Sequence, residues 1–201
     1  TKEFEILMKY VEPYYFKEKF TMPKLLINAG SDEFFSTDSW RFYFDQLPGE
    51  KYLQYIPNVN HSLNGTYLNE NLFSFYTRII NGQSFPNVSW EIKNDSLFGK
   101  VDTEEEYKVS IWTANNQFTR DFRLWEEGEL WNQSLLKRNT QNEYKINLKS
   151  DNDGYTATML EFIFNPDSDF PLILTTGPYV MPNEYPYQSY IPKQLDSEKN
   201  D

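Results

Sequence analysis

Hydrophobic and polar positions follow two different patterns along this chain. Up to residue 83, apolar residues recur at helical spacing or stand in short continuous runs, whereas from residue 86 onward they alternate with polar residues. The stretch 84–86 between them has the composition of a linker. We therefore predict two domains, residues 1–83 and 86–187, followed by a polar tail over 188–201.

The first part is predicted to contain helices and two buried strands. The expected helices lie within 1–20 with a break at Pro13, over Trp40–Leu47 after a cap at Asp38 or Ser39, and from a cap at Asn69 or Asn71 to about Asn81, with Gly82 just after the end. The expected strands are Lys24–Asn28 and Lys51–Ile56. The aromatic residues Tyr14, Tyr15, Phe16 and Phe20 are expected to pack under the first strand, with a pocket wall as the alternative.

The second part is predicted to be all β. Seven short strands are expected over Val88–Ile92, Phe98–Val101, Tyr107–Thr113, Phe122–Trp125, Tyr144–Leu148, Tyr155–Phe164 and Leu172–Thr176. Turn residues separate them at Asn94-Asp95, Asn115-Asn116 and Asp151–Gly154. This pattern is typical of an antiparallel sandwich of the immunoglobulin or fibronectin type, in which we expect Trp112 and Phe162 to be buried.

Two residues suited to catalysis follow the two predicted strands of the first part. Asp32 comes just after the first strand, and His61, the only histidine, lies in the loop after the second. Because ligand sites gather beyond the carboxyl ends of parallel strands, we expect the two side chains within hydrogen-bond reach, at about 2.6–3.2 Å. A histidine titrates near neutral pH, and a carboxylate on its other ring nitrogen fixes the tautomer. His61 and Asp32 are therefore the candidate catalytic base and acid.

Each of these residues also has a structural interpretation. His61 could be a loop histidine satisfied by its neighbours, and Asp32 could be a turn residue, because Gly-Ser-Asp is common turn chemistry. Glu33 and Asp38 are rival acids, but both come later after the end of the strand. We therefore favour Asp32 as the partner of His61.

The same stretch resembles the PhoPQ-activated pathogenicity-related family, which is of the α/β-hydrolase type. The motifs that carry the resemblance are Asp32-Glu-Phe-Phe35, Tyr43-Phe-Asp45, Leu47-Pro-Gly-Glu-Lys-Tyr52 and Pro57-Asn-x-x-His-Ser-Leu63, with further matches at Val11–Tyr14 and Arg120–Arg123. The resemblance implies that residues 1–83 are the C-terminal part of an α/β-hydrolase domain, with parallel strands between helices, and that a β-sandwich follows. It also implies the catalytic order Ser, Asp, His. Through secreted proliferation repressors of social amoebae, it further implies an extracellular, growth-inhibiting role.

The nucleophile that would complete a serine hydrolase is missing from the sequence. No Gly-x-Ser-x-Gly motif occurs, since the nearest match at Gly82–Pro86 lacks the final glycine, and only 31 residues precede Asp32. We expect the serine to lie upstream, in a longer protein of which this is the C-terminal part, or to have been lost. Two functions therefore stay open: a serine peptidase or esterase, with a peptide as one substrate, and a signalling protein that binds a cell-surface receptor.

Composition argues against several other classes. A net charge of −11 argues against nucleic acid and anionic membranes as partners, and no apolar run is long enough to insert into a bilayer. With no cysteine and one histidine, zinc sites of the Cys/His type are excluded, and we expect neither metal nor cofactor.

Two acidic stretches could bind calcium instead, Asp102–Glu106 and Asp151–Gly154. We favour a solvated connection between strands for the first and a hairpin turn for the second. Core positions are favoured over sugar stacking for Trp90, Trp112, Trp125 and Trp131.

Four N-glycosylation sequons occur, at Asn64, Asn87, Asn94 and Asn132. The chain is rich in asparagine, so several sequons are expected by chance. Three of the four fall in predicted loops or at strand edges, where glycans can be attached in a secreted eukaryotic protein. Together with the resemblance, they predict an extracellular glycoprotein.

Overall fold

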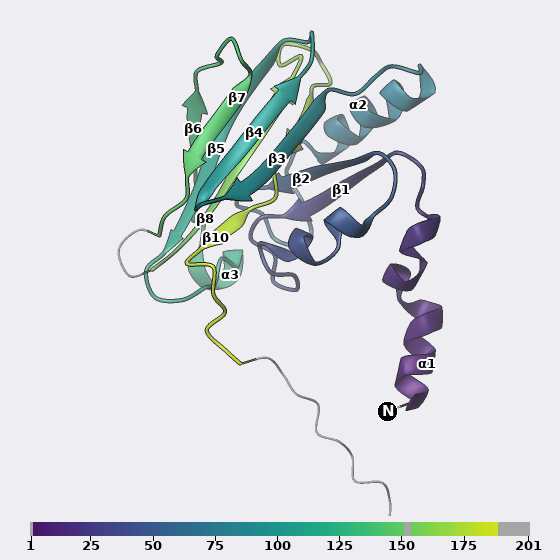
Figure 1. Ribbon diagram of the computed structural model, residues 1–201, viewed down its shortest axis with the longest axis vertical. Coiled ribbons are helices and arrows are strands. Elements are labelled where there is room, and N and C mark those ends of the chain that lie inside the picture. Colours follow the sequence, from purple (N-terminus) through teal and green to yellow (C-terminus); the bar gives the residue numbers. More distant parts are fainter. Residues whose placement is uncertain (1, 151–153, 189–201) are drawn as a thin grey trace, which may run out of the picture.

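The computed structural model describes residues 2–150 and 154–188, which form three sheets and several helices (Figure 1). The helices are α1 (Lys2–Val11), α2 (Leu68–Ile80) and α3 (Leu124–Glu127), with the 3₁₀ helices η1 (Pro13–Lys19), η2 (Ser39–Phe42) and η3 (Phe44–Gln46). The strands are β1 (Lys24–Ala29), β2 (Lys51–Ile56), β3 (Asn87–Lys93), β4 (Ser96–Asp102), β5 (Tyr107–Asn116), β6 (Trp131–Leu136), β7 (Glu143–Asn147), β8 (Tyr155–Phe164), β9 (Leu172–Thr175) and β10 (Tyr179–Met181).

The predicted α/β-hydrolase portion is wrong for the described residues. β1 and β2 do pair in parallel, but this sheet has only two strands, and the other two sheets of the described chain are antiparallel. A parallel sheet of the hydrolase type needs helices across both of its faces. Here β2 instead packs beside the antiparallel part, where the Tyr55 backbone N–H donates a 2.9 Å hydrogen bond to Thr175 Oγ1 of β9.

The two antiparallel sheets pack on each other, in agreement with the predicted β-sandwich. One has the order β10-β8-β5-β6, with β9 also paired to β8, and the other has the order β3-β4-β7. Leu97 of β4, Val109 of β5 and Phe162 of β8 are buried in their common core. Gly99 allows this close approach, because a Cβ there would lie 2.7 Å from Leu160 Cδ1. Phe162 is fully buried as predicted, whereas Trp112 is only partly buried.

A second hydrophobic cluster joins the two predicted domains. It combines Trp40 and Tyr55 from the first part with Trp131 and Met159 from the second. The Trp40 indole also donates a 2.8 Å hydrogen bond to the carbonyl of Pro178. The two parts therefore share a core, and the domain boundary at 84–86 stays a prediction.

The predicted helix over Trp40–Leu47 is instead two short 3₁₀ helices, η2 and η3. Asp38 occupies the cap position of η2 but makes no capping hydrogen bond with its side chain. Its carboxylate pairs with Arg120, 82 residues away. A long-range ion pair has therefore replaced the local cap that the sequence suggested.

One strand prediction in the second part is also wrong, and two strands of the structure, β6 and β10, were not predicted. The segment Phe122–Trp125 runs into α3 rather than forming a strand, and Asp121 accepts hydrogen bonds there from the backbone N–H and side chain of Arg123. The strand β6 was not predicted, because only its first residue, Trp131, is buried and the next four are exposed. Such a strand has no alternation that a sequence pattern could reveal.

The expected cap of α2 is wrong as well, although the helix itself is confirmed. α2 begins at Leu68, and Asn71 lies inside its first turns. The Asn71 side chain is fully buried: it donates to the carbonyl of Ile173 at 2.9 Å and accepts from the Ile173 N–H at 2.8 Å. These two hydrogen bonds connect α2 to β9. Gly82 adopts a positive φ of 62° just after the helix, as its position predicted.

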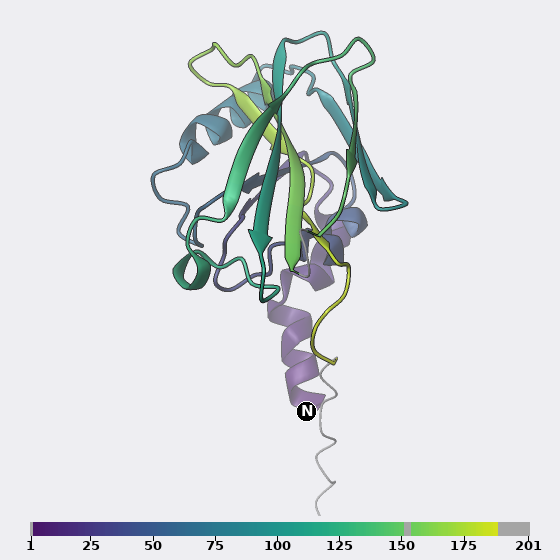
Figure 2. The ribbon, with the colours of Figure 1, turned by 90° about the vertical axis from the view of Figure 1, so that its left-hand side faces the viewer.

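α1 and η1 extend away from the rest of the molecule (Figures 1 and 2). The helix break at Pro13 is confirmed, but no residue of either helix is buried. Tyr14, Tyr15 and Phe20 are exposed, so the prediction that the aromatic patch packs under β1 is wrong.

Glu161 of β8 is a buried carboxyl group without a cation beside it among the described residues. Its Oε1 accepts a 3.1 Å hydrogen bond from Gln133 Nε2. Burial raises the pKa of Glu161, and the hydrogen bond from Gln133 opposes this shift without cancelling it. The protonated form therefore suits the fold better than the ionised form.

Replacing Glu161 with glutamine is expected to stabilise the protein at neutral pH. A raised folded-state pKa gives stability that is complete below the unfolded value, about 4.5, and is lost as pH rises through the folded value. Glutamine stays neutral and keeps the acceptor oxygen. Urea unfolding from about pH 4 to about pH 8 measures the difference between E161Q and the parent, which should grow with pH. A difference that is constant across this range would contradict the explanation.

Candidate acid–base site

Asp32 and His61 lie together beyond the carboxyl ends of β1 and β2. The distance from His61 Nδ1 to Asp32 Oδ2 is 3.0 Å. The predicted contact is therefore confirmed, and its cause is the parallel register of β1 and β2, which brings the two following loops to one edge. The catalytic role of the pair stays a prediction.

The second oxygen of Asp32 fixes the direction of the carboxylate. Oδ1 accepts hydrogen bonds from the backbone N–H groups of Phe34, at 2.8 Å, and Phe35, at 3.2 Å. This is the turn chemistry that formed the structural interpretation of Asp32. One side chain makes both sets of contacts, because the turn occupies Oδ1 and leaves Oδ2 for the histidine. The side chain is only 7% exposed, so water competes little for it.

The backbone and ring of His61 contact neighbouring residues, whereas the outer part of the side chain is open to solvent. Its backbone N–H donates a 3.0 Å hydrogen bond to Glu33 Oε2, and its ring lies 5.0 Å from the Phe34 ring in an edge-on arrangement. The side chain is 50% exposed, and within residues 2–150 and 154–188 its Nε2 atom has no hydrogen-bond partner. This geometry leaves Nε2 available to a reacting group.

The two rival acids have other partners. Glu33 binds the backbone of His61 rather than its ring. The Asp38 carboxylate accepts hydrogen bonds from Arg120, at 2.6 and 3.3 Å, and from Arg41, at 3.2 Å. The preference for Asp32 as the contact of the His61 ring therefore holds.

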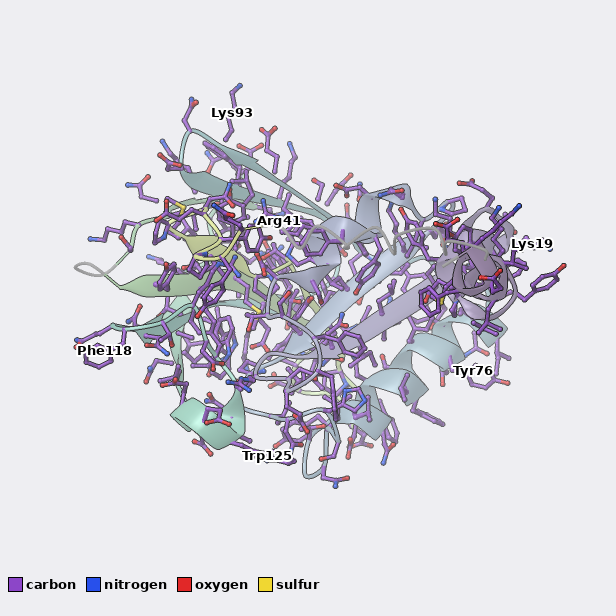
Figure 3. All side chains as sticks on the ribbon, turned by 90° about the horizontal axis from the view of Figure 1, so that it is seen from below. Lys19, Arg41, Tyr76, Lys93, Phe118 and Trp125 are labelled. Carbon is purple, nitrogen blue, oxygen red and sulfur yellow. The ribbon has the colours of Figure 1, made fainter. Side chains whose placement is uncertain are left out.

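A cleft of about 540 Å³ opens beside Asp32. Its walls are the loop after β1 (residues 32–37), the segment 118–123 with part of α3, and Tyr155, Pro186 and Tyr187. Phe118 projects outward from one wall (Figure 3). The volume is in the range of ordinary ligand sites.

The charges around this cleft do not balance. Arg120 is bound by Asp38, and Arg123 is bound by Asp121 at 2.9 and 3.0 Å. Both arginines are therefore neutralised by a carboxylate. The remaining acids of the wall are Asp32, Glu33, Glu126 and Glu127, and the nearest cation to Glu126 in the described chain is 3.9 Å away. The cleft consequently favours a ligand with positive charge, and its aromatic rings add apolar and cation–π surface.

Two residues that hold the site, Trp131 and Asn58, were not predicted to have this role. Trp131 Nε1 donates a 3.2 Å hydrogen bond to the carbonyl of Gly30, and the Asn58 side chain pairs with the backbone of Trp131. Trp131 was expected only as a core residue, and the structure confirms that it is buried. No local signal could have revealed contacts that span 73 and 101 residues.

The acidic run Asp102–Glu106 is a connection between strands, as expected. Glu105 forms a two-pronged ion pair with Arg78, at 2.7 and 2.6 Å, which lowers the pKa of the Glu105 carboxyl. No group of three or more acidic or histidine side chains that could hold a metal ion is present in the described residues. The other calcium alternative, Asp151–Gly154, lies largely outside them.

The remaining candidates differ in their exposure. Trp125 is exposed, so its predicted core position is wrong, while Trp90 and Trp112 are half-buried. All four sequon asparagines, Asn64, Asn87, Asn94 and Asn132, are exposed. In the described part of the chain, no helix is long and apolar enough to cross a membrane.

Comparison with known proteins places the chain in a family. Residues 1–123 match the family model of the PhoPQ-activated pathogenicity-related protein. The chain is also similar to autocrine proliferation repressor protein A of Dictyostelium discoideum, with 29% identity over 210 residues. This match covers 91% of the chain but only 42% of the relative's length. No solved structure matches the chain. Since the family model covers more than half of the sequence, the chain belongs to the PhoPQ-activated pathogenicity-related protein family.

Proposed function

We propose that this chain is part of a secreted protein that represses cell proliferation and hydrolyses peptides with its Asp32–His61 pair. Similarity to an autocrine proliferation repressor supports the first role. The 3.0 Å contact between His61 Nδ1 and Asp32 Oδ2 is the observation that carries the second. The four exposed sequon asparagines support export and glycosylation.

In the proposed reaction His61 is the general base and then the general acid. Its Nε2 atom takes the proton of a serine hydroxyl as that oxygen bonds to the substrate carbonyl, and the C–N bond then breaks as Nε2 gives the proton to the leaving amine. Asp32 accepts the Nδ1–H, which fixes the tautomer and stabilises the imidazolium. Water completes the cycle by hydrolysing the acyl-enzyme. We propose that the serine comes from a part of the protein outside this sequence, because the relative is more than twice as long as the matched stretch.

A peptide with basic and aromatic side chains is the proposed substrate. The cleft beside Asp32 supports this choice, since its arginines are each paired with an aspartate and its acids Glu33 and Glu127 form no salt bridge among the described residues. The exposed Phe34 and Phe118 offer surfaces for aromatic or aliphatic groups. For the repressor role, we propose that the partner is a cell-surface receptor.

One experiment tests both roles with the purified full-length protein and its His61→Ala variant. Each is added to proliferating cells, which are counted, and each is incubated with peptides that differ only in carrying lysine or glutamate. We expect the parent to slow proliferation and to cleave the lysine peptide faster. Repression by both proteins without cleavage by either would remove the hydrolase role and leave the signal. Equal cleavage by both would show that His61 is not the base.

A further inference from the structure

Trp131, the first residue of β6, contacts both of the loops that carry the acid–base pair. Its indole Nε1 donates to the carbonyl of Gly30, two residues before Asp32, at 3.2 Å. Its backbone N–H donates to Asn58 Oδ1 at 2.8 Å, and its carbonyl accepts from Asn58 Nδ2 at 2.8 Å. Asn58 comes three residues before His61. Trp131, which is buried and only 3% exposed, thus forms hydrogen bonds with one residue close to Asp32 and with one residue close to His61.

The two loops are also tied directly to each other. The Gly30 N–H donates to the carbonyl of Ile56 at 2.7 Å, and the Ser31 N–H donates to the carbonyl of Val59 at 3.2 Å. These bonds continue the β1–β2 pairing past the ends of the strands. They fix the loops relative to each other, whereas the bonds to Trp131 fix both loops to the antiparallel sheet.

The backbone at Gly30 and at Asn58 suits the contacts that these residues make with Trp131. A Cβ on Gly30 would lie 3.1 Å from Trp131 Nε1 and 3.0 Å from the Ile56 carbonyl oxygen, so only glycine fits without displacement. Asn58 has a φ of 53°, which asparagine tolerates better than most residues. Its amide offers a donor and an acceptor to Trp131, as a neighbouring strand would.

We propose that Trp131 is a positioning residue that sets the Asp32–His61 hydrogen bond from the antiparallel sheet. Trp131 lies outside residues 1–123, which match the family model. The sandwich is thereby part of the acid–base site and not a separate recognition module. The consequence for hydrolysis rests on the proposed function, but the positioning of the pair does not.

The test uses the fact that His61 is the only histidine of the 201-residue chain. With ¹⁵N-labelled imidazole, the His61 Nδ1–H gives a single downfield proton resonance when Asp32 shields it from exchange. Trp131→Phe removes the indole N–H but keeps an aromatic ring in the core. We expect this variant to lose the resonance, while its backbone amide spectrum stays dispersed. Loss of resonance without unfolding is the result that a purely structural role of Trp131 would not give.

Two further variants make the test decisive. Asn58→Gly removes both side-chain bonds without straining a positive φ, and it should also lose the resonance. Trp112→Phe is the matched control, because its indole N–H has no hydrogen-bond partner in the described chain, and it should keep the resonance. If Trp131→Phe does not fold, Asn58→Gly decides alone.

The outcomes separate this proposal from the proposed function. A resonance that persists in folded Trp131→Phe and Asn58→Gly would overturn the positioning role. Loss of the resonance in Trp112→Phe as well would show that the effect is not specific to Trp131 and would also overturn the proposal. If the resonance behaves as expected but the full-length protein never cleaves a peptide, the positioning role stands and only the hydrolase role fails.

Discussion

Replacing His61 with alanine in the full-length protein is expected to lower kcat for peptide hydrolysis by roughly 10⁴- to 10⁶-fold. The effect is large because the members of a triad act as a unit, and without the base the hydroxyl nucleophile keeps its proton. Steady-state kinetics on a chromogenic peptide measure it. A change of less than tenfold would show that His61 is not part of the machinery.

Asp32→Asn provides a sharper form of the same test. Asparagine keeps an oxygen for the N–H groups of Phe34 and Phe35, so the turn should survive. Its NH₂ group then faces His61 Nδ1 and favours the tautomer with the proton on Nε2, which cannot act as a base. We expect a loss of about 10⁴-fold in kcat with little change in stability. Glu33→Gln separates catalysis from binding, since this side chain hydrogen-bonds the His61 backbone rather than its ring and also lines the cleft: it should leave kcat within severalfold while KM for a lysine peptide rises.

Replacing Arg120 with methionine is expected to destabilise the protein by about 3 kcal/mol. Arg120 and Asp38 form an ion pair at 2.6 Å, with side chains 8% and 0% exposed. The variant strands a buried carboxylate, whose only other ion-pair partner in the described chain is the partly exposed Arg41. The estimate lies at the lower end of the range for broken buried pairs because Arg41 remains. Chemical denaturation gives the change in the free energy of unfolding.

Two further variants test whether the unpaired charge of Asp38 causes the loss of stability. Arg123→Met breaks a surface pair with Asp121 and should change stability by less than about 1 kcal/mol. The double variant Arg120→Met with Asp38→Leu removes both buried charges and should recover part of the loss. If the double variant is less stable than Arg120→Met alone, burial of an unpaired charge is not the cause.

The sequence could predict the parts of the fold that depend on local order. β1, β2 and α2 follow from runs and stripes of apolar residues within a few turns of chain. The contact of Asp32 with His61 follows from the same information, because each residue is placed by the strand just before it.

The parts that could not be predicted depend on partners distant in sequence. Asp38 looks like a helix cap until Arg120 is known to reach it, and Asn71 looks like one until Ile173 is known to pair with it. The α/β-hydrolase prediction failed for a similar reason. The family resemblance implied a parallel core between helices, whereas only β1 and β2 pair in parallel among the described residues and β2 packs beside β9 of the antiparallel part.

The shared core has a consequence for how the protein is made. The Trp40 indole binds the carbonyl of Pro178, and the Tyr55 N–H binds Thr175, contacts that span 138 and 120 residues. A ribosome adds only about 5–20 residues per second, and contacts so distant in sequence form slowly. The first part therefore leaves the ribosome well before Thr175 and Pro178, and its apolar surface stays exposed until they follow. We expect the acid–base pair to reach its native geometry only after Thr175 and Pro178 have left the ribosome, so that a nascent chain that ends before them does not yet hold Asp32 and His61 in place.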